Sequence, residues 1–284
     1  MVSEENRGFD TLKQFEHDYN CPIGELETKV LQFVVESTKI FDDSHDYRHA
    51  LIVANNALLM YKKFKDNNGD NGEYNGLNKL CIAYNDVNIS KYILYLALLH
   101  DVCDHKYSES ISRDKLTEFV RDNITGNFYA HLNDLIDMVS YSRQLMMEQG
   151  LNDSELEKLE KYHIIDKFVL DIVRSADRQE AIGEIGVERV RLFSINKRKS
   201  KTKMEIDIEI VYHGFEKLLR LVPENYINKI FHTDEIIRRH NYCIDYIKKI
   251  IQDYSLIGKN ILVETGKVKP DFGKYYDIAL LNKL

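Results

Sequence analysis

The sequence predicts an all-α protein built as a bundle of helices. Over long stretches, apolar residues recur every three or four positions, which is the period of helices that bury one face. Only 3 of the 284 residues are proline, at positions 23, 223 and 270, so few positions interrupt a helix. Because 44% of the residues are hydrophobic, the chain can form a sizeable core. We therefore expect an all-α bundle with short non-helical insertions.

Several stretches carry this helical pattern. Asp42–Ser44 precede the second of them and offer N-cap side chains, and the third contains the run Tyr92–Leu99, which is typical of a buried helix. In chain order, helices are expected over residues 24–41, about 46–64, about 89–102, 113–123, 127–147, 154–175, 207–221 and 233–253.

The segments between these helices are less regular. Residues 1–20 are polar and fit either a short helix or a tail, and the Gly- and Asn-rich residues 66–78 predict a loop. The basic run 197–203 is typical of a solvated loop, or of a rim that attracts anions. Residues 204–211 alternate apolar and acidic side chains, which favours a short strand or hairpin arm. Residues 256–284 are a tail to which we assign no structure.

Charge and composition exclude several classes of protein. The net charge of −7 disfavours a broad nucleic-acid surface, although a local basic pocket for one small anion stays compatible with it. No apolar stretch reaches the about 18 residues that a membrane span requires. The four cysteines form no CxxC pair and indicate reduced thiols, and the polar N-terminus is unlike a signal peptide. We expect a soluble cytoplasmic protein without membrane contact or a stable nucleic-acid partner.

Histidine and aspartate residues stand where apolar helices begin or end. His49 shares a helical face with Val53 and Met60, His100-Asp101 follows the run that ends at Leu99, and Asp177 follows another apolar helix. Adjacent residues of a helix point about 100° apart, so His100 and Asp101 reach one ion only near a helix end or at a distortion of the helix. A single histidine on an apolar face is more often a core residue, so the prediction rests on the set.

The set has the chemistry of a metal site. Burying imidazoles and carboxylates costs free energy unless they are paired or bind a metal ion, and helices of a bundle can bring them together. The four candidate ligands are His49, His100, Asp101 and Asp177. Two imidazoles and two carboxylates suit one divalent transition metal ion such as Mn, Ni, Co, Fe or Zn.

The spacing His49…His100-Asp101…Asp177 resembles the H…HD…D signature of the HD-domain metal-dependent phosphohydrolases. Three longer motifs are similar to one bacterial HD subfamily that includes a nucleotide pyrophosphohydrolase. They read His45-Asp46-x-x-His49, Leu99-His100-Asp101-x-x-Asp104-x-Lys106 and Ala176-Asp177-Arg178-x-x-Ala181-Ile182-Gly183-x-Ile185-Gly186. The C-terminal segments 213–220 and 238–240 resemble the same subfamily. In one departure, Ile52-Val53 stands where the subfamily usually has Arg-Val.

This resemblance implies a domain organisation. It covers about residues 28–255 and implies an all-helical HD domain there, with the metal site at its centre. Residues 1–27 are then an N-terminal extension and residues 256–284 a C-terminal tail.

The resemblance also implies roles for individual residues. Asp101 and Asp104 are the expected catalytic residues, with Asp104 as general acid/base or as the group that orients the water. A carboxylate that only caps a helix end is an equally good interpretation of Asp104. The residues expected to contact the substrate are Lys106, Arg178, Lys217, Arg220 and His45. Solvent-facing cations are an equal alternative for Arg178, Lys217 and Arg220.

The expected activity is hydrolysis of a (deoxy)nucleoside triphosphate to the monophosphate and pyrophosphate. Three alternatives stay open: a 5′-nucleotide phosphomonoesterase, a cyclic-nucleotide phosphodiesterase, and a regulatory module that binds a metal or a nucleotide without turnover. The sequence specifies neither the base nor the physiological metal. It also leaves the oligomeric state open, with a homodimer as one option.

Overall fold

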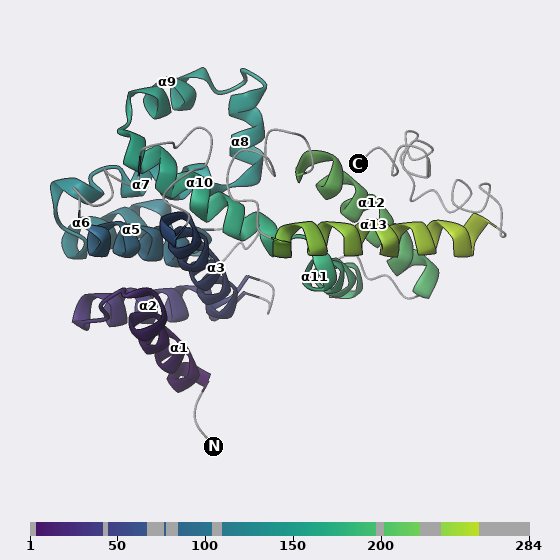
Figure 1. The fold of residues 1–284 in the computed structure, drawn as a ribbon, viewed down its shortest axis with the longest axis horizontal. Coiled ribbons are helices and arrows are strands. Elements are labelled where there is room, and N and C mark those ends of the chain that lie inside the picture. The colour runs from purple at the N-terminus through teal and green to yellow at the C-terminus, as the bar shows by residue number, and fades with distance from the viewer. Residues whose placement is uncertain are drawn as a thin grey trace. The chain divides into compact units, whose positions relative to one another are not determined.

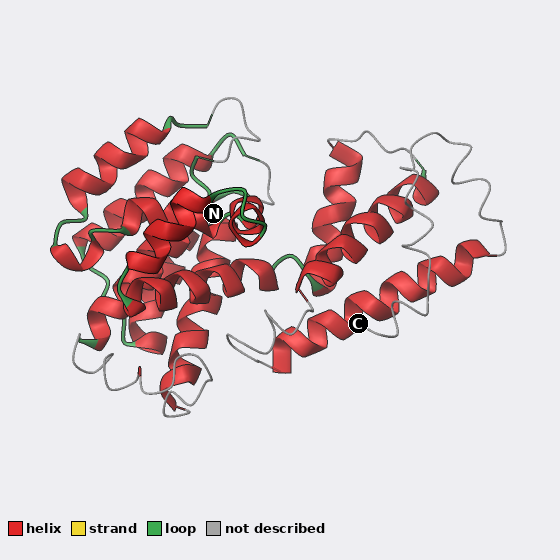
Figure 2. Ribbon diagram, turned by 90° about the horizontal axis from the view of Figure 1, so that it is seen from above, coloured by secondary structure: helices red, strands yellow, loops and turns green. Residues whose placement is uncertain are grey.

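The structure is a computed structural model, and it is described for residues 4–41, 45–66, 77, 85–103, 110–196, 202–221 and 234–255. Regular structure within these ranges is helical, and they contain no strand (Figure 1, Figure 2). This confirms the all-α fold class. The chain divides into two compact units, Met1–Ala176 and Asp177–Leu284. The division expected at residues 27 and 255 stays a prediction.

The first unit is built around a buried helix, α5 (Asp86–Leu99), which packs against α3 (Tyr47–Asp66), α2 (Glu25–Thr38) and α7 (Leu132–Val139) (Figure 1). The other helices of this unit are α1 (Glu4–Tyr19), α6 (Arg113–Asn123), the 3-10 helix η2 (Asn127–Tyr129), α8 (Tyr141–Glu148), α9 (Asp153–Lys161) and most of α10 (Ile164–Gln179). The prediction for residues 113–123 is confirmed at both ends.

The sequence of α5 explains its central place. Asn85 begins the helix, since its side chain accepts the backbone N–H of Val87 at 3.2 Å. All residues from Tyr92 to Leu99 are buried, as the apolar run predicts. Burial of two phenol groups is compensated by carboxylates on neighbouring helices: Tyr92 donates to Asp166 at 2.8 Å, and Tyr95 donates to Glu27 at 2.5 Å.

The first helix of the chain and the predicted face of α3 both belong to this core. In α1, Leu12 and Phe15 are buried, which decides between the two expectations for residues 1–20 in favour of a packed helix. The predicted face of α3 is buried along its whole length, at His49, Val53, Asn56, Ala57 and Met60. The burial of His49 is therefore a consequence of the helical period of α3.

Two predicted helices are each interrupted. The stretch 127–147 breaks at Ser140, between α7 and α8, and the stretch 154–175 breaks at Tyr162 and His163, between α9 and α10. The second break has a capping cause. The carboxylate of Asp166 accepts the backbone N–H of His163 at 3.2 Å, and the ring Nδ1 of His163 accepts the N–H of Ile165. This reciprocal cap starts a new helix.

The second unit contains α11 (Gly183–Asn196), α12 (Lys203–Leu221) and α13 (Asp234–Ser255), and each of these helices packs against the other two. Its buried apolar side chains include Ile182, Val190, Ile208, Val211, Cys243, Ile244, Ile247 and Ile250. Ile237, which also lies on α13, is 37% exposed. At 100° per residue it lies about 80° from the centre of the buried stripe.

The strand or hairpin arm expected at residues 204–211 is wrong, because these residues lie in α12. A reciprocal cap starts this helix: Glu205 accepts the backbone N–H of Thr202, and Thr202 Oγ1 accepts the N–H of Glu205, both at 3.2 Å. Lys203 then pairs with Asp207 at 2.6 Å, one turn later. These local interactions override the alternating pattern. Among the helices of the described ranges, none is both long and apolar enough to span a membrane.

Candidate metal centre

Two helix ends of the first unit bring three of the four candidate ligands together. His49 lies in the first turn of α3, and its position is fixed by Asp46, which directly precedes the helix. The carbonyl oxygen of Asp46 accepts the N–H of His49 at 3.0 Å, and its carboxylate accepts the N–H of Arg48 at 2.9 Å. Asp46 thereby acts as an N-cap residue. The Arg48 side chain holds the same carboxylate at 2.6 Å.

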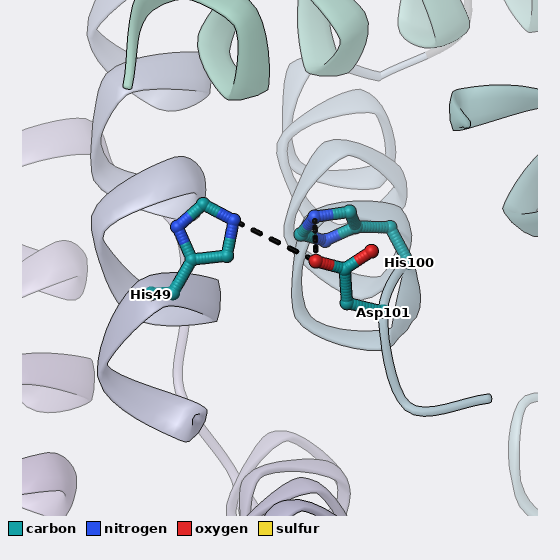
Figure 3. Close-up of side chains that lie close together, drawn as sticks. All are labelled: His49, His100 and Asp101. Carbon is teal, nitrogen blue, oxygen red and sulfur yellow. Dashed lines mark ion pairs between the residues drawn. The ribbon is translucent and has the colours of Figure 1, made fainter. Parts of the chain in front are cut away.

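His100 and Asp101 lie directly after the last residue of α5. His100 is the C-cap, and the chain continues as a turn. This break in the helix lets two adjacent side chains turn toward the same place, as the sequence predicts. Nε2 of His100 lies 3.3 Å from Oδ2 of Asp101 (Figure 3).

The same carboxylate oxygen also faces His49 across the gap between α3 and α5. Nε2 of His49 lies 3.7 Å from Oδ2 of Asp101 (Figure 3). The imidazole rings of His49 and His100 lie edge to face, with 5.5 Å between their centroids. The side chains of His49 and His100 are buried, whereas the side chain of Asp101 is 29% exposed. One ligand atom of each residue lies within 4.8 Å of the others, which is close enough for the three to hold one metal ion.

These separations fit a first-row divalent ion. Metal–nitrogen and metal–oxygen bonds to such ions are about 2.0–2.2 Å long, so neighbouring ligand atoms on one ion are about 3 to 4 Å apart. The two distances to Oδ2 of Asp101, 3.3 and 3.7 Å, fall within that range. Two imidazoles and one carboxylate are also ligands that such ions prefer, and three protein ligands leave further positions for water and substrate.

A backbone contact prepares His100 to be a ligand. Its Nδ1 lies 2.8 Å from the carbonyl oxygen of Ala97, one turn earlier in α5. Because a carbonyl oxygen can only accept a hydrogen bond, Nδ1 carries the proton. The lone pair is then on Nε2, the atom that faces Asp101, and the ring is held in the orientation that a metal ligand requires. This set of donors therefore fits a divalent transition metal ion.

The structure places Asp177 in the last turn of α10. Its carboxylate forms an ion pair with the guanidinium group of Arg178, whose side chain is buried. The group of potential ligands found among the described residues consists of His49, His100 and Asp101. The role of Asp177 as a fourth ligand stays a prediction.

The other predicted site residues are only partly described. His45 lies just before α3, with its ring 6.1 Å from that of His49, centre to centre, in an edge-on arrangement. Asp104 and Lys106 lie outside the described residues. The backbone of Lys217 and Arg220 is part of α12, but their side chains lie outside the described part. The substrate and acid/base roles of these residues stay predictions.

Sequence reasoning missed the residues that support the ligands. The cap of α3 was expected from Asp42–Ser44, which lie outside the described residues, whereas the structure assigns capping contacts to Asp46. A polar side chain directly before an apolar helix was the available signal. No signal could identify the carbonyl oxygen of Ala97, because every residue of a helix has one.

Comparison with models of known protein families finds no match, and comparison with curated proteins finds none either. One solved structure, the crystal structure of Bacillus subtilis YpgQ in complex with ADP, is similar to this chain, with 21% sequence identity and a TM-score of 0.47. The similarity covers 80% of this chain and 97% of that chain. At this level it supports no conclusion about the family or the ligand of the present protein.

Proposed function

We propose that the protein is a metal-dependent phosphohydrolase of the HD-domain type that acts on a nucleotide and releases pyrophosphate from a (deoxy)nucleoside triphosphate. The observation that supports this proposal most is the convergence of His49, His100 and Asp101 from the facing ends of two helices. The sequence motifs around these residues, which resemble those of nucleotide phosphohydrolases, supply the class of substrate.

In this proposal His49, His100, Asp101 and Asp177 hold one Mn, Ni, Co, Fe or Zn ion. A bound ion of this kind supplies Lewis-acid activation of water and of a phosphoryl oxygen. His100 contributes a ring whose proton is already committed to Ala97, so its Nε2 has no proton to lose when it binds the ion. Asp101 brings the negative charge that balances the cation, and its 29% exposed side chain leaves one side of the site open.

The remaining roles concern the proton and the phosphates. Asp104 is proposed to orient the attacking water and to accept its proton, because it follows Asp101 by three residues. Lys106, Lys217, Arg220, Arg178 and His45 are proposed to contact the phosphates. For Arg178 the ion pair with Asp177 offers support, since it puts a buried cation beside a proposed metal ligand.

The test is a hydrolysis assay on the purified protein with a panel of nucleotides and each of the five metals. We expect hydrolysis of at least one nucleoside triphosphate, abolished by EDTA and restored by metal. Asp101→Asn should lower kcat/KM by about 10³-fold or more, because the negative ligand is lost. Asp122→Asn, at an exposed pair with Arg121 on α6, is the matched control and should retain full activity.

The products decide between the alternatives. Pyrophosphate and a nucleoside monophosphate support the proposed reaction, whereas orthophosphate indicates a phosphomonoesterase and a linear product from a cyclic nucleotide indicates a phosphodiesterase. Full activity after exhaustive chelation would contradict a metal-dependent mechanism of any kind. Metal binding without turnover of any nucleotide in the panel would support the regulatory module instead.

A further inference from the structure

The last turn of α10, which carries Asp177, is held by a residue of α13. The guanidinium group of Arg239 donates to the carbonyl oxygen of Gln179 at 3.0 Å and to the carboxylate of Glu180 at 2.8 Å. Gln179 is the final residue of α10, and its carbonyl oxygen otherwise accepts only the long bond from the N–H of Ile182, at 3.5 Å, among the backbone contacts of the described residues. A cation at this end also complements the helix dipole.

The contact between Arg239 and Glu180 is buried, and it depends on the planar guanidinium group of arginine. Glu180 is 1% exposed and the side chain of Arg239 is 11% exposed. A third bond, from Nε of Arg239 to Glu235 at 2.7 Å, holds the guanidinium from its other edge. Because the planar group has donors on several edges, it reaches all three acceptors at once, which the single ammonium group of lysine could not do in this geometry.

The backbone that follows α10 leaves room for the side chain of Arg239. Gly183 has a φ of +76°, and a Cβ atom there would lie 2.7 Å from Cγ of Arg239. The stem of Arg239 therefore passes directly over Gly183. One turn later on α13, Sγ of Cys243 accepts the backbone N–H of Gly183 at 3.0 Å. Two residues of α13 thus fix the turn that follows Asp177.

The backbone of α10 tightens in its last turn. Its carbonyl groups at Asp177 and Arg178 accept the N–H groups of Glu180 and Ala181 at 3.1 and 3.0 Å, which is the shorter 3-10 pattern. From outside the turn, Arg239 donates to Gln179 and Glu180, and Arg189 donates to the carbonyl oxygen of Glu180 at 3.5 Å.

We propose that Arg239 is a positioning residue for Asp177, acting through the last turn of α10. This inference rests on the proposed function, because it requires Asp177 to be a metal ligand. Contacts that orient metal ligands typically change metal affinity by 10- to 100-fold when removed. Arg239 would have that effect without touching the metal ion or the substrate.

The experiment measures the dissociation constant of Mn²⁺ or Ni²⁺ by calorimetry on the full chain, with circular dichroism as a check on the fold. We expect Arg239→Met to weaken metal binding by about 10-fold or more and Arg239→Lys by less. The matched control is Arg238→Met, the preceding residue of α13, which removes exposed pairs to Glu235 and Glu184 and should change the constant by less than about twofold.

A combination of variants separates positioning from a general loss of structure. If Arg239 acts through Asp177, adding Arg239→Met to Asp177→Asn should weaken metal binding no further than Asp177→Asn alone. Because Arg239→Met leaves the buried carboxylate of Glu180 without this cation, the variant Arg239→Met/Glu180→Gln is measured as well. It removes that charge and should show the same weakened metal binding in a folded protein.

The outcomes distinguish this inference from the proposed function. If the wild type binds none of the five proposed metals, or if Asp177→Asn binds metal as tightly as the wild type, the ligand assignment is wrong and the inference is overturned with it. If Asp177→Asn weakens binding but folded Arg239→Met/Glu180→Gln does not, only the inference is overturned. Additive losses in the combined variant Asp177→Asn/Arg239→Met would also overturn it.

Discussion

At the scale of single residues, Glu27 shows how this protein buries a charge. The side chain is 1% exposed, yet it accepts hydrogen bonds from Lys91 at 2.7 Å, from Tyr95 at 2.5 Å and from the backbone of Gly24 at 2.7 Å. Burial alone would raise the pKa of Glu27, but these three donors outweigh it and hold the pKa below its ordinary value. Glu27 thereby connects α2 to α5, the helix that ends at His100.

Replacing the cation of this cluster should destabilise the first unit. Lys91→Met leaves the carboxylate buried without its charged partner, so we expect the free energy of unfolding to fall by about 2 to 4 kcal/mol. Lys29→Met, at an exposed lysine on α2, is the control and should change it by less than about 0.5 kcal/mol. Chemical denaturation followed by circular dichroism measures both. Equal stability of the two variants would show that Lys91 does not stabilise Glu27.

His240, on α13, should make the stability of the second unit depend on pH. Its side chain is buried, its Nε2 has no hydrogen-bond partner among the described residues, and burial lowers its pKa below 6.5. The unfolded chain therefore binds a proton more readily than the folded one. Stability should be highest above about pH 6.5 and should fall as the pH decreases from there toward the lowered pKa.

The measurement is the melting temperature between pH 8 and pH 5. In the variant His240→Gln, the decrease in melting temperature that begins near pH 6.5 should disappear. His17→Gln is the control, because the side chain of His17 on α1 is 92% exposed and its change should leave the profile as it is. An unchanged profile in His240→Gln would assign the pH dependence to other groups.

At the scale of elements, two glycines separate backbone strain from steric clash. Gly150 and Gly183 both have positive φ, +66° and +76°, so alanine is strained at either position. Beside Gly150 the nearest atom to an added Cβ is 3.8 Å away, whereas beside Gly183 it is Cγ of Arg239 at 2.7 Å. The two positions therefore differ mainly in the room that a methyl group has.

Alanine should consequently destabilise the protein more at Gly183 than at Gly150. We expect Gly150→Ala to lower the free energy of unfolding by about 1 kcal/mol, because of the backbone conformation alone. Gly183→Ala should cost about 1 to 3 kcal/mol more, because the stem of Arg239 has to move. Urea denaturation of both variants gives the difference. If the two variants lose the same free energy of unfolding, the side chain of Arg239 can move away from Gly183 without a loss of stability.

At the scale of the whole molecule, features that depend on the hydrophobic period were predictable from the sequence. Long-range polar contacts were not, apart from that of His49 with Asp101, which belongs to the predicted ligand set. The fold class, the buried run of α5 and the meeting of His100 with Asp101 at a helix end were predictable, because each depends on residues close in sequence. The contact of Arg239 with Gln179 was not, because it joins residues 60 positions apart. The strand expected at residues 204–211 failed because a cap outweighed the alternation.

Metal binding should stabilise the folded chain, because the three convergent ligands are together only in the folded state. At a metal concentration about 100 times the dissociation constant, linkage predicts a gain of about 2.7 kcal/mol, or roughly 5 to 10 °C in melting temperature. We expect Mn²⁺ or Ni²⁺ to produce this rise in a thermal scan and EDTA to reverse it.

Ca²⁺ prefers oxygen ligands and should have little effect on the melting temperature. His49→Gln should abolish the rise, whereas His17→Gln, at an exposed histidine, should retain it. A rise that survives in His49→Gln would place the bound metal elsewhere on the protein.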